Sequence, residues 1–301
     1  MNPSSSDDAA LYSQAITYLS ALAMTQPRIL ALFAMIPIFN AQLIPGMLRF
    51  AIAAAFGAIA APALVPQINS VDPSVMLLLV IIIKEVFIGF VMGYFVGILF
   101  YAFEAVGFYI DNQRGASVAS TLNPLTGNDT SPLGILFNQA FIVFFFVSGG
   151  FTLLLAMMYN SFALWSVFSW TPTLREESMP LFLEQLNLLV KLALLLGSPA
   201  IVAMFLAEIG LALVSRFVPN LQVFFLAMPI KSAVAMMVLM FYAGTMLQYG
   251  LEFIDKIDLV LPTLNQEWVN DDIGSIKPDV TTVPNSGTGA SGAQPRGSVP
   301  Q

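Results

Sequence analysis

Six long apolar segments dominate this sequence and constrain its fold more than any single motif. They lie near residues 17–39, 47–65, 74–103, 133–159, 186–214 and 222–250. A helix of about 20 residues crosses the hydrocarbon core of a bilayer. Only helices and closed barrels satisfy their own backbone groups in lipid, and barrel strands would show short stretches of alternating polarity instead. The segments therefore predict an all-α, polytopic membrane protein with about six apolar helices.

The scarcity of charge supports this prediction and excludes several classes of function. Charged residues make up 10% of the chain, whereas a soluble domain carries roughly 25%. Lipid or apolar partner subunits must therefore cover much of the surface. Because the chain has neither cysteine nor histidine, it has no disulfide, no thiolate or histidine metal site and no Ser-His or Cys-His nucleophile. The net charge of −7 argues against nucleic acid as a partner.

The apolar segments are expected to be kinked. Each of five prolines lies within or at the end of a segment, and an internal proline removes one hydrogen bond and bends the helix; they are Pro27, Pro37, Pro62, Pro199 and Pro229. Two segments start with a capping residue followed by proline, at Asp72-Pro73 and at Ser131-Pro132, which is typical of a helix N-terminus.

The C-terminal end of the chain has a different composition. After about residue 262 the sequence is rich in Gly, Ser, Thr and Pro. Such a segment cannot bury enough apolar surface to fold. We therefore predict a helical membrane domain over residues 1–262 and a disordered tail over residues 263–301.

Ionisable residues within the apolar segments call for partners, and besides Arg28 and Arg49 there are five more. A charge at the bilayer centre costs about 2.5–3.5 kcal/mol, so such groups face other charges or water; they are Lys84, Glu85, Lys191, Glu208 and Lys231. Either they pair inside the bundle or extend to the membrane surface, or they meet neighbouring subunits or line a conduit. Because Lys84 and Glu85 are adjacent and point about 100° apart, at least one needs a partner from elsewhere in space.

Three glycines in the third segment form a stripe at spacing four: Gly89, Gly93 and Gly97. Small residues at this spacing lie on one face of a helix and let another backbone approach closely. The stripe predicts a packing surface. Its partner is either a helix of the same chain or a neighbouring subunit.

A polar stretch follows the third segment and holds our candidate gate or assembly residues, which are Glu104, Gly107, Asp111, Gln113, Arg114 and Gly115. On a helix, Glu104 and Asp111 share one face, Asp111 and Arg114 can pair at i, i+3, and Gly115 can end the helix. A helix continuing to Arg114 would run about 60 Å, twice the bilayer core. A surface loop with a local salt bridge is the simpler alternative.

Sequence templates for catalysis are absent. The chain has no phosphate-binding loop, no His-Glu-x-x-His helix and no Gly-x-Ser-x-Gly elbow. We therefore predict that it is not an enzyme and has no catalytic residue, no cofactor and no metal. A secondary transporter of a small solute is the main alternative function, because interrupted helices with buried Lys and Glu suit a midplane binding site. We detect no internal repeat of matched broken segments to support it.

Several of these motifs together resemble a known family. The stretch Glu104-x-x-Gly107-x-x-x-Asp111-x-Gln113-Arg114-Gly115 is similar to the T subunit of the type III secretion export apparatus (SctT), which is related to flagellar FliR. The same pattern includes Gln26-Pro27-Arg28, Asn123-Pro124, Ser131-Pro132-Leu133-Gly134 and Ser148-Gly149-Gly150-Phe151. The unbroken run from Asp111 to Ser117 is closer to the injectisome branch than to the flagellar one. The resemblance covers roughly residues 15–260.

The resemblance implies a function that composition alone does not give. It implies a multi-pass protein of the bacterial inner membrane that joins the R and S subunits (SctR and SctS) in a helical export-gate assembly. It also implies contact with the switch subunit SctU and passage of secreted, unfolded polypeptides through the gate. A subunit buried among such partners would account for kinked helices and for charges within apolar segments.

Overall fold

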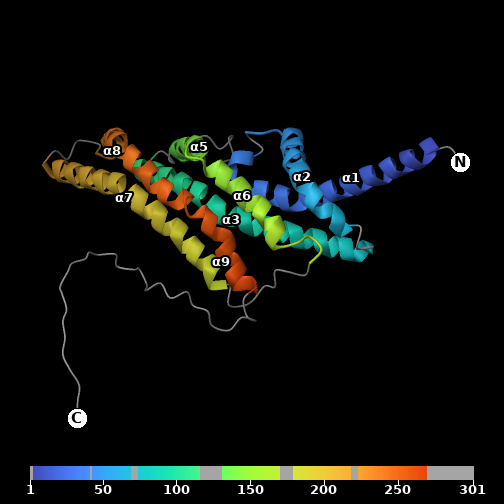
Figure 1. Ribbon diagram of the computed structural model, residues 1–301. Coiled ribbons are helices and arrows are strands. Elements are labelled where there is room, and N and C mark those ends of the chain that lie inside the picture. Colours follow the sequence, from blue (N-terminus) through green and yellow to red (C-terminus); the bar gives the residue numbers. More distant parts are fainter. Residues whose placement is uncertain are drawn as a thin grey trace, which may run out of the picture. The chain divides into compact units, whose positions relative to one another are not determined.

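The computed structural model describes residues 3–40, 43–68, 74–115, 131–169, 179–217 and 223–269, and every regular element in these ranges is a helix. The elements are α1 (Pro3–Met35), η1 (Pro37–Phe39), α2 (Gly46–Ile68), α3 (Val75–Arg114), α5 (Pro132–Val147), α6 (Gly150–Leu164), α7 (Met179–Phe217), α8 (Val223–Ile254) and α9 (Ile257–Val269) (Figure 1). The all-α, polytopic prediction is confirmed.

Not every predicted segment is an unbroken span. Four stretches of described residues are long and apolar enough to cross a membrane: α2, α3, α7 and residues 225–266 of α8 and α9. The helices α5 and α6 together make a fifth, broken span. The predicted first segment corresponds to α1, which is helical but is not among these spans.

The longest helix, α3, lies at the centre of the domain and packs against α1, α5, α7 and α8. Its N-cap is Ser74, whose side-chain oxygen accepts a hydrogen bond from the Leu77 amide. The cap predicted at Asp72-Pro73 lies outside the described residues. The helix itself begins at Val75. It ends at Gly115, as the sequence predicts, with a φ of 82° that favours glycine. Over its 40 residues α3 is about 60 Å long.

The single helix predicted over residues 133–159 is in fact two helices, α5 and α6, bent by 74°. Gly149 supplies the break, because its φ of 83° lies in the left-handed region. The predicted start of this segment is confirmed: Ser131 caps α5 by accepting from the Gly134 amide, and Pro132 occupies the first turn.

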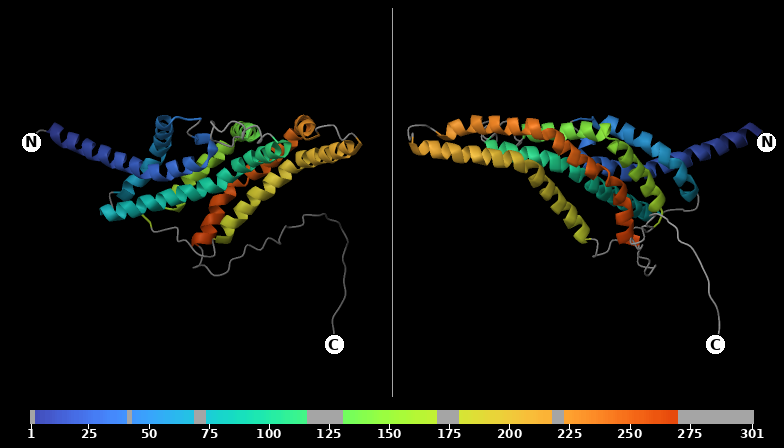
Figure 2. Two further views of the ribbon diagram at one scale, coloured as in Figure 1. Left: turned by 180° about the vertical axis from the view of Figure 1, so that it is seen from behind. Right: turned by 60° about the vertical axis from the view of Figure 1, so that its left-hand side comes forward.

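The C-terminal helices form a hairpin followed by a short helix. The helices α7 and α8 lie side by side in both views (Figures 1 and 2), and each contains a proline, Pro199 and Pro229. The predicted domain boundary at residue 262 falls inside α9, which continues to Val269 and buries Leu264. Residues 263–269 are therefore helical. The rest of the predicted tail, residues 270–301, lies outside the described residues.

A cluster of aromatic rings packs α3 against α5. Phe103 stacks on Phe141 with ring centroids 4.1 Å apart, and Phe100 meets Phe141 and Phe145 edge-on at 5.0 and 5.1 Å. All four rings are buried. This packing fixes the end of α3 against α5, and the polar stretch after residue 103 is positioned by it.

Candidate functional site

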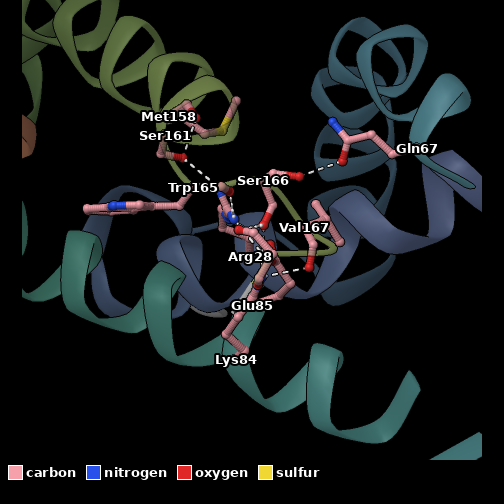
Figure 3. Close-up of polar contacts among 10 residues, drawn as sticks. Arg28, Gln67, Lys84, Glu85, Met158, Ser161, Trp165, Ser166 and Val167 are labelled. Atoms are coloured by element: carbon pink, nitrogen blue, oxygen red, sulfur yellow. Dashed lines mark hydrogen bonds and ion pairs between the residues drawn. The ribbon is translucent and has the colours of Figure 1, made fainter. Parts of the chain in front are cut away.

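The first polar cluster joins α1 to α3 through a fully buried ion pair. Arg28 Nε donates to Glu85 Oε2 at 2.7 Å, and Arg28 Nη2 donates to Glu85 Oε1 at 2.9 Å (Figure 3). Both side chains have no exposed surface. Two parallel, charge-assisted hydrogen bonds are the strongest arrangement available to an arginine and a carboxylate. The pair therefore fixes the relative position and rotation of the two helices.

The remaining donors of Arg28 connect this pair to the end of α6. Its Nη1 donates to Ser161 Oγ at 3.0 Å, and its Nη2 donates to the Trp165 carbonyl at 2.9 Å. The guanidinium also lies over the ring of Phe162, 4.3 Å from the centroid. Trp165 follows α6, whose last carbonyl groups have no partner within the helix. Arg28 thus ties α1, α3 and α6 together at one point.

Lys84 completes the cluster by binding the irregular backbone after α6. Its Nζ donates to the carbonyl oxygens of Ser166, Val167 and Ser169 at 3.0, 2.6 and 2.9 Å. It also lies 3.2 Å from Glu85 Oε1. The adjacent lysine is thus a secondary partner of Glu85, whose two oxygens are both bound by Arg28. Of the two interpretations left open above, pairing within the chain is the one that applies to these two charges.

The glycine stripe packs on α1 of the same chain. A methyl group at Gly89 would overlap the carbonyl oxygen of Arg28, and one at Gly93 would lie 2.7 Å from Met35 Cβ. At Gly97 it would lie 2.8 Å from the Met35 carbonyl oxygen. The stripe therefore brings the backbone of α3 against α1 beside the Arg28–Glu85 pair, which favours the internal contact over a neighbouring subunit.

The second polar cluster joins the end of α3 to the start of α5. Asp111 Oδ1 accepts from Arg114 Nε at 2.7 Å, and its Oδ2 accepts from Ser131 Oγ at 2.6 Å and from the Leu133 amide at 3.0 Å. A carboxylate at a helix N-terminus is stabilised by the unpaired amides and by the helix dipole. Asp111 and Ser131 therefore cap α5 together, and Arg114 balances the charge.

Two other residues of the polar stretch serve the same junction. A methyl group at Gly107 would overlap the backbone of Leu133 and Gly134, so α3 and α5 touch there without a side chain between them. One turn earlier, Glu104 Oε2 accepts from Asn138 Nδ2 at 2.8 Å. The alternative of a surface loop is wrong, because this stretch forms the last three turns of α3.

The other predicted residues lie at the α7–α8 hairpin. Lys231 Nζ lies 2.9 Å from Glu208 Oε2 and 3.5 Å from the Gln113 carbonyl oxygen. The side chain of Gln113 has no polar partner among the described residues. Lys191 lies on the exposed side of α7 and, within the same residues, is not paired with an acidic side chain. For Lys191, contact with a charge on a neighbouring subunit therefore stays a prediction.

Sequence analysis did not place Arg28 in a site, although it is the central residue of the first cluster. Its partners lie 57, 133 and 137 residues away, and no local pattern links such positions. The available signal was one cation and one anion within two different apolar segments. Among the described residues there is no group of three or more metal-ligating side chains, and the two clusters hold helices together.

One family match covers most of the described helices. Residues 19–257 match the family described as "Bacterial export proteins, family 1". This chain belongs to that family. The match includes both polar clusters and ends at the first residue of α9.

Individual relatives of this export protein are named for protein translocation, for surface presentation of antigens and for flagellar biosynthesis. It is 39% identical to "Yop proteins translocation protein T" of Yersinia pestis, over 80% of this chain and 94% of the relative. It is 27% identical to "Surface presentation of antigens protein SpaR" of Salmonella typhimurium, over 79% and 88%. With "Flagellar biosynthetic protein FliR" of Bacillus subtilis it shares 29% over 70% and 82%. The predicted resemblance is confirmed, and membership of an export family excludes the solute-transporter alternative.

Proposed function

We propose that this export protein is a non-enzymatic, multi-pass subunit of the type III secretion export apparatus in the bacterial inner membrane. It assembles with the R and S subunits, contacts the switch subunit and contributes to the gate through which unfolded proteins are secreted. The observation that carries the proposal is the likeness to the Yersinia translocation protein T along 94% of that protein. Export-family membership and several apolar helices support placement in a membrane.

The distribution of charge and apolar surface supports assembly with other subunits. The ion pairs Arg28–Glu85, Asp111–Arg114 and Lys231–Glu208 lie inside the chain. Large apolar side chains are left open, such as Met47 at 90%, Phe217 at 84% and Phe241 at 81% exposure. Extensive exposed apolar surface marks contact with lipid or protein. The exposed Lys191 on α7 needs an anionic partner or water, which a neighbouring subunit of the gate would supply.

A deletion and purification experiment tests the proposal. Deleting the chain from its host bacterium should abolish the release of type III substrates into the medium, and the chain supplied from a plasmid should restore it. Purified from membranes in mild detergent, the chain should bring other membrane subunits with it. Secretion that continues in the deletion strain, or a chain that purifies alone, would contradict the proposal.

A further inference from the structure

Three polar side chains form a stripe along the exposed side of the first half of α7. They are Glu184, Asn187 and Lys191, at spacings of three and four residues. At about 100° per residue, these positions lie within about 60° of one another around the helix. All three residues are exposed. The buried residues of α7 lie on its other side, which packs against α3 and α8; they are Leu192, Ala193, Leu196, Gly197, Ala200 and Met204. The stripe therefore faces away from the helical domain, at whose edge α7 lies (Figure 2).

The side chains of this stripe have no polar partner among the described residues. Glu184 and Lys191 are two turns apart, about 10 Å along the axis, and do not pair with each other. Exposed apolar side chains flank the stripe on both sides of Lys191; they are Leu183, Leu186, Val190, Leu194 and Leu195. Whatever covers these apolar side chains covers the stripe as well. A charge or an amide under such a cover requires a partner, because its desolvation is otherwise costly.

The order of the two charges excludes two simple covers for the stripe. Two copies of this chain inserted with the same orientation have parallel α7 helices, so Lys191 would face Lys191 and Glu184 would face Glu184. Like charges that face each other across an interface oppose association. An anionic lipid would meet Lys191 alone, because Glu184 repels it. The stripe instead fits a surface whose charges run in the complementary order.

We propose that this face of α7, which belongs to one of the apolar spans, docks a membrane helix of another export-apparatus subunit. The partner helix presents an acidic side chain to Lys191, an amide or hydroxyl to Asn187 and a basic side chain to Glu184. Its two charged residues are about seven positions apart, which matches the distance of about 10 Å between Glu184 and Lys191. Polar residues within an apolar helix interface fix the register and orientation of the two helices. This inference rests on the proposed function, which supplies other membrane subunits as partners.

Purification of full-length variants from membranes in mild detergent tests the stripe. Lys191→Gln should lower the amount of co-purified membrane subunits about tenfold, because the acidic side chain that faces it loses its partner. Lys191→Arg keeps the charge and should retain most of the complex. Neither variant should change the thermal stability of the isolated chain, because Lys191 makes no polar contact within its described part. The matched control is Arg216→Gln, which removes an exposed cation from the last turn of the same helix and should leave recovery unchanged.

Exchanging the two charges separates a specific partner from a general need for polarity. The double variant Glu184→Lys, Lys191→Glu keeps the net charge of α7 but reverses the order, so it should recover the complex no better than Lys191→Gln. Wild-type recovery from both the exchange and Lys191→Gln would overturn the inference. The proposed function would then still stand, because the chain brings its subunits with it. A wild-type chain that purifies alone would contradict both.

A cross-linking measurement in assembled complexes covers the case in which a charge variant fails to fold. A photoreactive amino acid in place of Leu195, which is half-exposed and one turn after Lys191, leaves all three polar side chains in place. A cross-link to a different membrane subunit, at a helix with an acidic and a basic residue about seven positions apart, supports the inference. A cross-link to lipid alone, or to a second copy of this chain, would overturn it.

Discussion

The two polar clusters of this export protein both contain an arginine–carboxylate ion pair, but the two pairs differ in burial. The Arg28–Glu85 pair has no exposed surface and joins residues 57 positions apart. The Asp111–Arg114 pair joins neighbouring turns of one helix, and its arginine is 16% exposed. The buried pair has no access to water if a partner is lost, while the second pair lies near the end of α3. The stability lost when an ion pair of this fold is broken therefore depends on whether the charge left behind is buried or can reach water.

The largest expected effect comes from breaking the buried pair on one side. Glu85→Gln leaves Arg28 charged and buried, which costs roughly 3–5 kcal/mol. We expect the chain to lose most of its folded yield and its thermal stability in detergent, measured by fluorescence-detected size exclusion after heating. The exposed Glu184→Gln should change stability by less than about 0.5 kcal/mol.

Replacing both partners sharpens this test. The double variant Arg28→Met, Glu85→Leu removes the charges together and should recover most of the stability, because a buried ion pair and an apolar pair of similar volume are nearly equivalent. A double variant no more stable than Glu85→Gln would show that the hydrogen bonds to Ser161 and Trp165, and not the ion pair, hold this point.

Glycine substitutions beside the two clusters should lower stability by similar amounts. Gly89→Ala and Gly107→Ala each place a methyl group onto a facing backbone, so each should cost about 1–3 kcal/mol through forced separation of helices. A methyl group at Gly210 on α7 would meet no atom within 4 Å, and Gly210→Ala should be neutral or stabilise by roughly 0.5–1 kcal/mol. Recovery of the multi-subunit complex on a native gel reports all three, and a normal complex from both clashing variants would contradict the close approach.

At the α3–α5 junction we expect smaller and unequal effects. Asp111→Ala removes three hydrogen bonds and should cost about 1.5–3 kcal/mol, while Arg114→Ala should cost about 1 kcal/mol because the arginine is partly exposed. Secretion titres and membrane leakage should follow this order, with Gln113→Ala milder. The double variant should be less damaging than the sum of the two singles. Wild-type secretion in both single variants would show that the α3–α5 junction has no functional role in the gate.

The smallest effect is expected at the α7–α8 hairpin. Glu208 is 48% exposed, so Glu208→Gln should lower stability by no more than about 1 kcal/mol. Thermal unfolding in detergent measures it. A loss as large as that of Glu85→Gln would mean that burial does not set the ranking.

The helices were predictable from local signals, and their partners were not. Apolar length located the segments, Gly115 marked the end of α3, and Ser131-Pro132 marked the start of α5. The break at Gly149 was missed because an apolar run on both sides hid two glycines that permit a sharp turn. Residue 262 lies inside α9, and buried residues such as Leu264 continue this helix beyond a proline.

The two clusters also differ in how far their contacts could be predicted from the sequence. Asp111 and Arg114 are three residues apart, so helical geometry alone predicts their contact. Arg28 meets Glu85 only after α1 and α3 pack along the glycine stripe, and Ser161 arrives from a third helix. The sequence indicated that at least one of Lys84 and Glu85 needed a distant partner, and the identity of that partner required the three-dimensional arrangement.

The long separation within the buried cluster has a consequence for how the protein is made. A ribosome adds roughly 5–20 residues per second, so Glu85 emerges about 3 to 11 s after Arg28, and Ser161 about 7 to 27 s after it. During this interval a nascent α1 holds a cation without its carboxylate, and the ion pair that docks α1 on α3 cannot form. The first helix therefore takes its final position only after residue 85 of the third has been synthesised.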